Sequence, residues 1–371
     1  MAISERTRHY RAPGRVNLIG EHTDYNDGFV MPIALDRSTW VAATPRADRL
    51  IVARSESYPD VVTIDLDRPP APRTGHWSDY VAGVAVVLDR ATRLLGADLQ
   101  IRSDVPIGAG LSSSAALEVA CGYALLDLSG GVMDLTGLAR ACQRAEDEFG
   151  GTRCGLMDQF IACHGRAAHA LMLDTRTLGT RWLPMPAGAH VMICDTMKRH
   201  RLASSEYNAR QEDCRAGVRA LSRRYPDVRA LRDVTRDRLE SARGDLSERL
   251  YRRCRHVVTE NARVEAAADA LAARDLSRFG QLMAASHHSL RDDYEVSCAE
   301  LDAMVAIAMQ NDGVYGARMT GGGFGGCVVC LIDERGVANV PGTVARRYEA
   351  TTGVRPDVWI SSAGPGVGRL Q

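Results

Sequence analysis

The stretch DVPIGAGLSSSAALEVA, residues 104–120, combines a strand end, a glycine-rich loop and a helix start. The pattern predicts a strand that ends at Pro106, followed by a loop in which Gly108 and Gly110 let the backbone approach an anion closely. Ser112–Ser114 then open a helix. A single serine would be enough to cap its first turn. Three serines favour an anion site, because a helix start offers free N–H groups and a positive dipole end. A plain capped turn is the alternative.

A second stretch, GRVNLIGEHTDYNDG at residues 14–28, places charged side chains around a short apolar pattern. Val16–Ile19 predict a buried strand. The charged or titratable residues of the stretch are Arg15, Glu21, His22, Asp24 and Asp27. The strand pattern leads directly into most of these residues, which favours a functional strand end. A solvated surface loop is the alternative.

The stretch RMTGGGFGGCVVCLI, residues 318–332, contains five glycines around Phe324. Gly321, Gly323 and Gly326 match the spacing of a dinucleotide-binding loop, but that loop requires a helix after the glycines. Here a β-branched strand pattern follows. We therefore expect the loop to pack its backbone against another glycine loop or a ligand, with a purely structural turn as the alternative.

The stretch RAEDEFGGTRCGLMDQF, residues 144–160, contains two carboxylates of interest. Glu146 lies late in a predicted helix. Asp158 follows a Cys-Gly turn and lies between Met157 and Gln159. A carboxylate in such an apolar stretch is costly to bury unless it has a partner. A carboxylate that is buried with a partner and a helix cap are the two interpretations.

The composition of the chain is that of an ordinary globular protein. It has 371 residues, with 46 basic and 46 acidic side chains, so no net charge favours nucleic acid or an anionic membrane. We find no run of about 18 apolar residues and no apolar core near the N-terminus. These features predict a cytoplasmic protein that has neither nucleic acid nor a membrane as a partner.

Lysine and cysteine usage exclude several classes of protein. Lys198 is the only lysine and follows no glycine loop, which excludes a P-loop and the strand lysine of a protein kinase. Cys327 and Cys330 form the only close pair among ten cysteines, and no second pair at ligand spacing suggests zinc. We expect reduced, partly buried thiols.

The order of elements predicts an α+β protein of two domains. Short strands and turns fill the first 65 residues, a Pro-rich loop covers residues 68–76, and helices and one strand follow to about residue 151. Strands return after residue 165, residues 203–310 are mostly helical, and the tail is again rich in strands. We predict an N-terminal domain over 1–170 and a C-terminal domain over 171–371.

Taken together, these motifs resemble those of the GHMP sugar kinases, in particular the members that phosphorylate galactose. GRVNLIGEHTDYNDG resembles their sugar signature, PIGAGLSSSAA their phosphate loop and TGGGFGGCVV their third motif. CGLMDQF and LASSEYNARQEDC match two further segments, and all five occur in the expected order. The resemblance implies a ribosomal-protein-S5-domain-2-like N-terminal domain and a ferredoxin-like C-terminal domain, with the active site in the cleft between them.

The resemblance also implies an activity and a set of residues. The activity is transfer of the ATP γ-phosphate to the anomeric hydroxyl of D-galactose, the first step of galactose catabolism. Asp158 would be the catalytic carboxylate and Arg15 its partner. Galactose would be held by Glu21, His22, Asp24, Gly155, Asp158 and Tyr207. ATP would be held by Trp77, Tyr80, Gly108, Ala109, Gly110, Leu111, Ser112, Ser113 and Ser114. Mg²⁺ would be held by Ser113 and Glu146.

This assignment explains the strand end at residues 14–28. A hexose carries hydroxyls that donate and accept hydrogen bonds, and Glu21, His22 and Asp24 offer two acceptors and one group that does either. Arg15, at the other end of the short strand, lies where a transferring phosphate needs positive charge. Whether Asp158 takes the hydroxyl proton or only orients the hydroxyl is open at this point.

Other functions remain as alternatives. A non-catalytic sugar and nucleotide sensor would keep the binding residues and lose catalytic ones, whereas Arg15, Asp158 and the serine run are all present. A dinucleotide oxidoreductase rests only on the glycine spacing of residues 321–326. Kinases for N-acetylgalactosamine or galacturonate would differ in pocket walls outside the motifs. We expect a monomer, although no sequence feature decides the oligomeric state.

Overall fold

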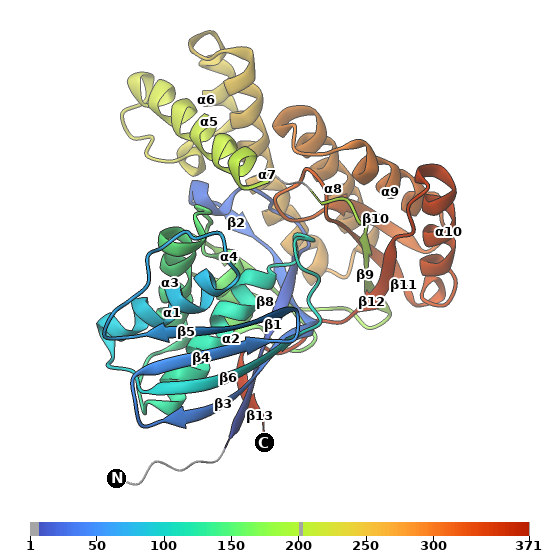
Figure 1. Cartoon of the computed structure of the whole chain (residues 1–371). Coiled ribbons are helices and arrows are strands. Elements are labelled where there is room, and N and C mark those ends of the chain that lie inside the picture. The colour runs from blue at the N-terminus through green and yellow to red at the C-terminus, as the bar shows by residue number, and fades with distance from the viewer. Residues whose placement is uncertain (1–6, 200–202, 371) are drawn as a thin grey trace.

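The computed structural model describes residues 7–199 and 203–370 and contains two sheet-based parts joined by a helical region (Figure 1). Leu202, the first residue of the motif LASSEYNARQEDC, lies outside the described residues. The predicted α+β class is confirmed, because mixed sheets and helices occur in both halves.

The first half is built around a six-stranded sheet with the order β13-β1-β3-β6-β4-β5. Its elements are β1 (Arg8–Asn17), β2 (Phe29–Val30), β3 (Pro32–Arg46), β4 (Leu50–Ser55), β5 (Tyr58–Asp65), α1 (Ser78–Ala91), β6 (Gly96–Ser103), α2 (Ser113–Leu128), α3 (Leu135–Ala145), α4 (Met157–His164), β7 (His169–Asp174) and β8 (Thr180–Pro184). β4 and β6 are parallel and the other pairs in this sheet are antiparallel. Helices α1–α4 lie together on one side of the sheet (Figure 1).

The second half is built around a four-stranded antiparallel sheet with the order β10-β11-β9-β12. Its elements are β9 (Ala189–Asp195), α5 (Ala203–Arg224), α6 (Arg236–Ser241), α7 (Glu248–Ala272), α8 (Leu276–Ser289), α9 (Ala299–Met309), β10 (Val314–Met319), β11 (Cys327–Asp333), α10 (Val340–Thr352), β12 (Asp357–Ser361) and β13 (Gly368–Leu370). Along the chain, the order strand, helices, two strands, helix and strand forms a ferredoxin-like arrangement, as predicted.

The two halves share a buried core. One apolar cluster lies within the first half and a second lies within the second half, whereas a third combines residues from both, such as Leu18, Ile33, Val264 and Val329. The last strand, β13, returns to pair with β1. The predicted division at residue 170 falls inside β7. The boundary between 1–170 and 171–371 stays a prediction.

Three elements differ from the sequence-based expectation. β5 was not predicted, because Pro59 and Asp60 are rare in central strands; β5 is an edge strand, where they are tolerated. The Glu146–Gly150 segment is a π turn that widens the end of α3, and α10 interrupts the strand-rich tail. All ten cysteines are free thiols. Among residues 7–199 and 203–370, no helix combines the length and apolar character needed to cross a membrane.

Candidate active site

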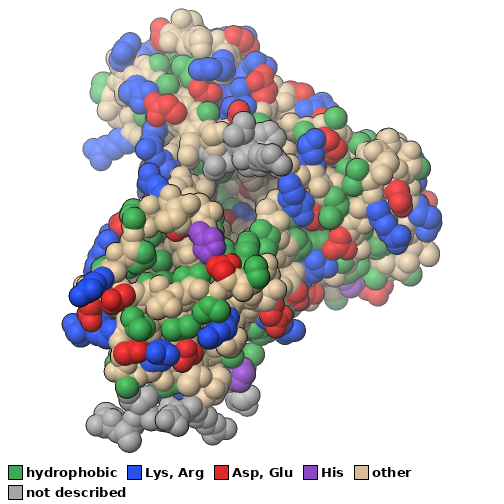
Figure 2. All heavy atoms as spheres, viewed as in Figure 1, with side chains coloured by type: hydrophobic (Ala, Val, Ile, Leu, Met, Phe, Trp, Pro, Cys, Tyr) green, Lys and Arg blue, Asp and Glu red, His purple; other side chains and the backbone are tan. Residues whose placement is uncertain are grey.

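A cleft of about 560 Å³ is lined by residues of both halves of the chain. Figure 2 shows a hollow between the helical region at the top and the sheet-containing part below it. Of the residues predicted from the sequence, those lining the cleft are Arg15, Glu21, His22, Asp24, Trp77, Tyr80, Gly108, Gly110, Ser112, Ser113, Ser114, Glu146, Asp158 and Tyr207.

Three predicted residues do not line this cleft. Ala109 and Leu111 are buried, and the Leu111 carbonyl accepts a hydrogen bond from the Arg15 N–H at 3.0 Å. Gly155 lies behind Asp24 and borders a second cavity. A Cβ atom at Gly155 would lie 1.9 Å from Asp24 Oδ2, so only glycine permits this approach. Gly155 therefore supports Asp24 from the side away from the cleft.

Arg15 and Asp158 form a two-pronged ion pair at the centre of the cleft. Arg15 Nε donates to Asp158 Oδ1 at 2.7 Å and Nη2 donates to Oδ2 at 2.9 Å. A bulge in β1 between Pro13 and Arg15 directs this side chain toward the glycine loop, where Nη1 donates to the Gly110 carbonyl at 2.6 Å. Asp158 lies in the first turn of α4 without capping it, since no side chain caps that helix. The cap interpretation of Asp158 is therefore wrong.

Ser112 also holds Asp158. Its hydroxyl donates to Asp158 Oδ2, and its backbone is left-handed, with φ 59° and ψ 47°. A serine in this region costs of order 1–3 kcal/mol, and such residues cluster at functional sites. The Ser112 side chain makes no capping bond to α2. The first N–H groups of α2 thus face the cleft beside the Arg15–Asp158 pair, where a helix start binds anions well.

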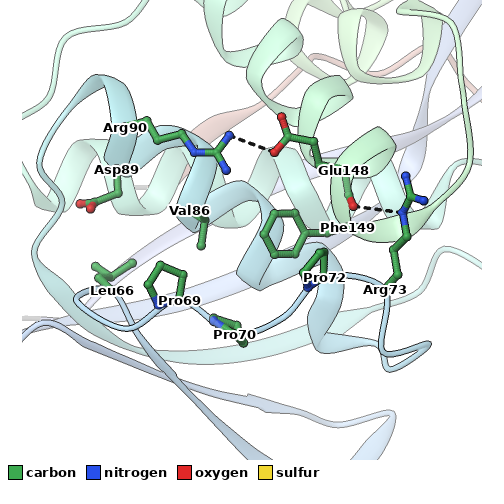
Figure 3. Close-up of a pocket in the computed structure, with 10 residues that line it drawn as sticks. All are labelled: Leu66, Pro69, Pro70, Pro72, Arg73, Val86, Asp89, Arg90, Glu148 and Phe149. Carbon is green, nitrogen blue, oxygen red and sulfur yellow. Dashed lines mark hydrogen bonds and ion pairs between the residues drawn. The ribbon is translucent and has the colours of Figure 1, made fainter.

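Glu146 projects from the π turn toward the start of α2. Ser114 Oγ donates to its Oε1 at 3.1 Å, whereas the Ser113 hydroxyl makes no hydrogen bond to the described residues. The Pro-rich loop and α1 support this turn, as Figure 3 shows: Arg73 of the loop donates to the Glu148 carbonyl at 3.2 Å, and Arg90 of α1 pairs with the Glu148 carboxylate at 2.9 Å. The turn that carries Glu146 is therefore anchored on both sides.

The donor set here fits Mg²⁺. Mg²⁺ in phosphate-transfer sites takes one or two protein oxygens and fills the rest of its shell with water and substrate phosphates. Glu146 and Ser113 supply a carboxylate and a hydroxyl of this kind. Burial, and then the negative charge of Asp158, raise the pKa of Glu146 to about 7. A cation in this position would oppose that rise.

The sugar-signature residues are held by the second half of the chain. Glu21 Oε1 accepts from the Gly321 N–H at 2.8 Å and Thr320 Oγ1 at 2.9 Å, and Arg318 lies 3.4 Å away. Arg318 is fully buried, so Glu21 and Arg318 form an ion pair inside the protein. The position of Glu21 therefore depends on contact between the two halves.

His22 lies in an aromatic cluster at the same end of the cleft. Its Nδ1 and the Tyr25 hydroxyl are 2.9 Å apart, and its ring centroid lies 5.3 Å from that of Tyr207. Burial lowers the pKa of His22 well below its ordinary value, so the imidazole is neutral. Within residues 7–199 and 203–370, the Tyr207 hydroxyl makes no hydrogen bond. A neutral imidazole and a phenol are suited to bind a neutral polyol.

Asp24 lies between the sugar-signature end and Asp158. Burial, and then the charge of Asp158, raise its pKa to about 7. The 3-10 turn Asp24–Asn26 holds it against Gly155. A buried carboxyl group in a cleft whose pKa is raised in this way is typical of active sites.

Trp77 and Tyr80, which were expected to flank an adenine, both line the cleft, and the Tyr80 ring lies beside Gly150 in the turn that carries Glu146. Trp77 stacks on Tyr58, with ring centroids 5.5 Å apart and planes at 9°, and its Nε1 donates to Asp60 at 3.3 Å. Tyr58 also lines the cleft and is 36% exposed. The aromatic wall therefore includes Tyr58 from the edge strand β5, which the sequence pattern did not identify.

The glycine loop of residues 321–326 packs on the phosphate loop. Cβ atoms at Gly321 and Gly326 would lie 2.7 Å from the Gly110 carbonyl and 2.6 Å from the Ala109 carbonyl. The expected packing of one glycine loop against another is confirmed. The sequence analysis did not identify the contacts made by Glu118, Gln159, Arg318 and Thr320. The one available signal was a polar residue within an apolar run, because burying such a residue is costly without a partner.

The cleft combines three features: a helix start suited to bind an anion, a carboxylate paired with arginine, and a polar pocket suited to bind a sugar. Together these features define a small-molecule kinase of the GHMP class. Three family signatures agree: the galactokinase galactose-binding signature over residues 3–45, the GHMP kinase N-terminal domain over 79–166 and the GHMP kinase C-terminal domain over 267–350.

Curated relatives and solved structures narrow this class further. The chain is 47% identical to a galactokinase of Roseiflexus sp. (strain RS-1) over 97% of this chain and 92% of that one. It is 50% identical to a galactokinase of Chloroflexus aggregans over 97% and 93%. A crystal structure of Lactococcus lactis galactokinase complexed with galactose matches with a TM-score of 0.95 and 35% identity, over 99% of this chain and 96% of that one. The chain belongs to the galactokinase family.

Proposed function

We propose that this chain transfers the γ-phosphoryl group of ATP to the anomeric hydroxyl of D-galactose. The observation that supports this most directly is the placement of the Arg15–Asp158–Ser112 group beside the start of α2. The likeness to the galactose-bound Lactococcus lactis enzyme supports galactose as the sugar. Family membership supports ATP as the donor.

In this proposal the start of α2 binds the phosphates. Ser112–Ser114 line the cleft and no side chain caps α2, so the N–H groups at this helix start would donate to the phosphates, and the helix dipole favours negative charge there. Trp77 and Tyr58 would contact the adenine at the far end of the cleft. Ser113 and Glu146 would hold Mg²⁺, which would supply charge neutralisation on the phosphate oxygens.

The sugar would lie against Asp24, His22 and Tyr207. Asp24 accepts hydrogen bonds from neighbouring hydroxyls when ionised, and His22 and Tyr207 contribute neutral donors or acceptors. Glu21 has one oxygen occupied by Thr320 and Gly321. Glu21 would therefore have two roles, one in binding the sugar and one in joining the two halves of the chain.

The chemistry depends on the Arg15–Asp158 pair. Asp158 accepts the proton of the anomeric hydroxyl as the oxygen–phosphorus bond forms, and the β-phosphate leaves as part of ADP. Arg15 holds both Asp158 oxygens and so sets the direction from which the carboxylate meets the hydroxyl. Transfers of this kind depend mainly on alignment and charge stabilisation.

A coupled assay of ADP release over a panel of monosaccharides tests the proposal. We expect galactose to be used far better than glucose, because a site that pairs with the C4 hydroxyl rejects its epimer by up to roughly 10⁴–10⁵. Equal use of glucose, or a preference for N-acetylgalactosamine or galacturonate, would contradict the galactose assignment. Binding of both substrates without ADP release would instead favour a sensor. Monomeric state and cytoplasmic location stay predictions.

A further inference from the structure

Glu118 is a buried carboxyl group that the proposed reaction does not use. It lies in α2, one turn after Ser114, and its side chain is fully buried. Its only hydrogen bond to the described residues comes from Gln159 Nε2 at 3.2 Å, and its Oε1 has no partner there. Burying a carboxyl with so little compensation is costly. Such a group requires a reason in the surrounding structure.

Gln159 joins Glu118 to Glu146. This side chain is fully buried in α4, next to Asp158, and its Nε2 also donates to Glu146 Oε2 at 2.6 Å. The Gln159 NH₂ group thus lies between the two carboxyl groups, with a longer contact to Cys154 Sγ at 3.8 Å. In this orientation the NH₂ group donates to an oxygen of each carboxyl group. Glu118 therefore helps to hold the Gln159 amide in the orientation that donates to Glu146.

The two oxygens of Glu146 are consequently held from two directions. Ser114 Oγ donates to Oε1 and Gln159 Nε2 donates to Oε2. Ser114 and Glu118 are four residues apart and so share one face of α2. This helix positions the Glu146 carboxylate directly through Ser114 and indirectly through Glu118 and Gln159.

We propose that Gln159 and Glu118 are positioning residues for the Mg²⁺ ligand Glu146. The inference rests on the proposed function, which makes Glu146 a metal ligand. Groups that hydrogen-bond a ligating carboxylate fix its orientation before the metal binds. The carboxylate therefore has little conformational freedom left to lose on binding. Gln159 holds Oε2 and leaves Oε1, beside Ser114, as the oxygen directed to the cation.

The test uses Mn²⁺ as a probe with the full-length protein and ADP. Free Mn²⁺ is followed by electron paramagnetic resonance, which reports metal binding without turnover. Gln159→Met preserves side-chain length and removes the donor. We expect Mn²⁺ to bind about 10- to 100-fold more weakly, as for other groups that support metal ligands, and galactose binding by calorimetry to remain unchanged. Mn²⁺ affinity equal to wild type would overturn the proposal.

A pair of variants at Glu118 tests the acceptor role. Glu118→Gln retains a carbonyl oxygen for the Gln159 amide, so we expect Mn²⁺ affinity close to wild type. Glu118→Met removes the acceptor and should weaken Mn²⁺ binding as Gln159→Met does. If Glu118→Gln loses as much affinity as Glu118→Met, the acceptor role is wrong.

Two controls separate the possible failures. Cys163→Ala alters a buried side chain of the same helix that does not contact Glu146, and it should lower the melting temperature without changing Mn²⁺ affinity. Glu146→Gln tests the metal role itself. If Glu146→Gln binds Mn²⁺ as wild type does, the proposed metal site fails. If Glu146→Gln loses Mn²⁺ binding and Gln159→Met does not, only the positioning role fails.

Discussion

The phosphate end and the sugar end of the cleft are constructed differently. At the phosphate end, Arg15, Ser112 and Asp158 bond to one another, and Ser114 bonds to Glu146. All of these residues belong to the first half of the chain. At the sugar end, Glu21 is held by Arg318, Thr320 and Gly321, and His22 lies against Tyr207 and Tyr294, all from the second half.

This difference separates two kinds of dependence. At the phosphate end the functional side chains bond to one another within the first half, and the second half contacts the loop backbone, for example at Ala109 and Gly110 through Gly321 and Gly326. The side-chain geometry of this end should therefore depend less on the contact between the halves than that of the sugar end. The sugar end exists only where the halves meet, so changes there should affect sugar binding and global stability together. Each prediction below tests one side of this contrast.

The largest effect is expected at the phosphate end, from Asp158→Asn. The amide preserves shape but neither accepts a proton nor pairs with the charge of Arg15. A positioned base is worth about 10²–10⁴ in rate, so kcat should fall by that factor while galactose binding by calorimetry persists. Near-wild-type turnover in steady-state assays would show that the Asp158 carboxylate is structural and would contradict the proposed mechanism.

The next effect is expected at the contact between the halves, from Arg318→Met. This change leaves the buried Glu21 carboxylate without its cation. Removing one partner of a buried pair costs about 3–5 kcal/mol, which urea unfolding should detect together with weaker galactose binding. The control is Arg335→Met, because that arginine is 90% exposed and should change stability little. Wild-type galactose affinity in Arg318→Met would contradict the shared origin of the sugar end.

A pH-dependent effect is expected from Asp24. Its ionised form is the hydrogen-bond acceptor for the sugar, and its pKa is raised to about 7. Galactose should therefore bind more tightly at pH 8 than at pH 6. Asp24→Asn should weaken binding at pH 8 by about 1.5–3 kcal/mol and abolish most of the pH dependence. Calorimetry at both pH values measures this, and an unchanged pH profile in the variant would exclude Asp24 as the titrating group.

The same pKa makes a prediction about stability without ligand. A carboxyl group whose pKa is raised by folding contributes stability below its unfolded pKa of about 4, and this is lost as the pH rises through about 7. The free energy of unfolding of the wild-type protein should thus fall, relative to that of Asp24→Asn, as the pH rises between these two pKa values. Because water in the cleft screens this charge, we expect only about 1 kcal/mol, measured as the difference in unfolding free energy at pH 5 and pH 8.

The smallest effect on turnover is expected from Ser112→Gly at the phosphate end. Glycine accepts the left-handed backbone, and only the hydrogen bond to Asp158 is lost. Arg15 still holds both oxygens, so kcat should fall about tenfold, in line with one charged hydrogen bond. Ser112→Ala should lose the same activity and be less stable than Ser112→Gly, because alanine keeps the backbone strain that glycine relieves. A larger kcat loss in Ser112→Gly than in Asp158→Asn would contradict the expectation that Asp158 contributes more to turnover than Ser112.

The sequence by itself determined the class of fold and most of the residues that face the cleft. Glycine loops, a serine-rich helix start and charged strand ends are local patterns, and each depends on neighbours within a few positions. For this reason each of the segments at 14–28, 104–120 and 144–160 was a candidate for a functional role, and the resemblance to the GHMP sugar kinases joined them into one site. The third glycine loop was also expected to pack on another loop, and it packs on the phosphate loop.

Only the tertiary structure decided which of these residues bond to one another. Ser112 meets Asp158 across 46 positions, Glu118 meets Gln159 across 41 and Glu21 meets Arg318 across 297. Gly155 was placed behind Asp24, and Glu146 was paired with Ser114, by the same long-range packing. A hydrogen bond depends on distances of a few tenths of an ångström. Those distances are set by how helices and sheets pack, and no local pattern in the sequence encodes them.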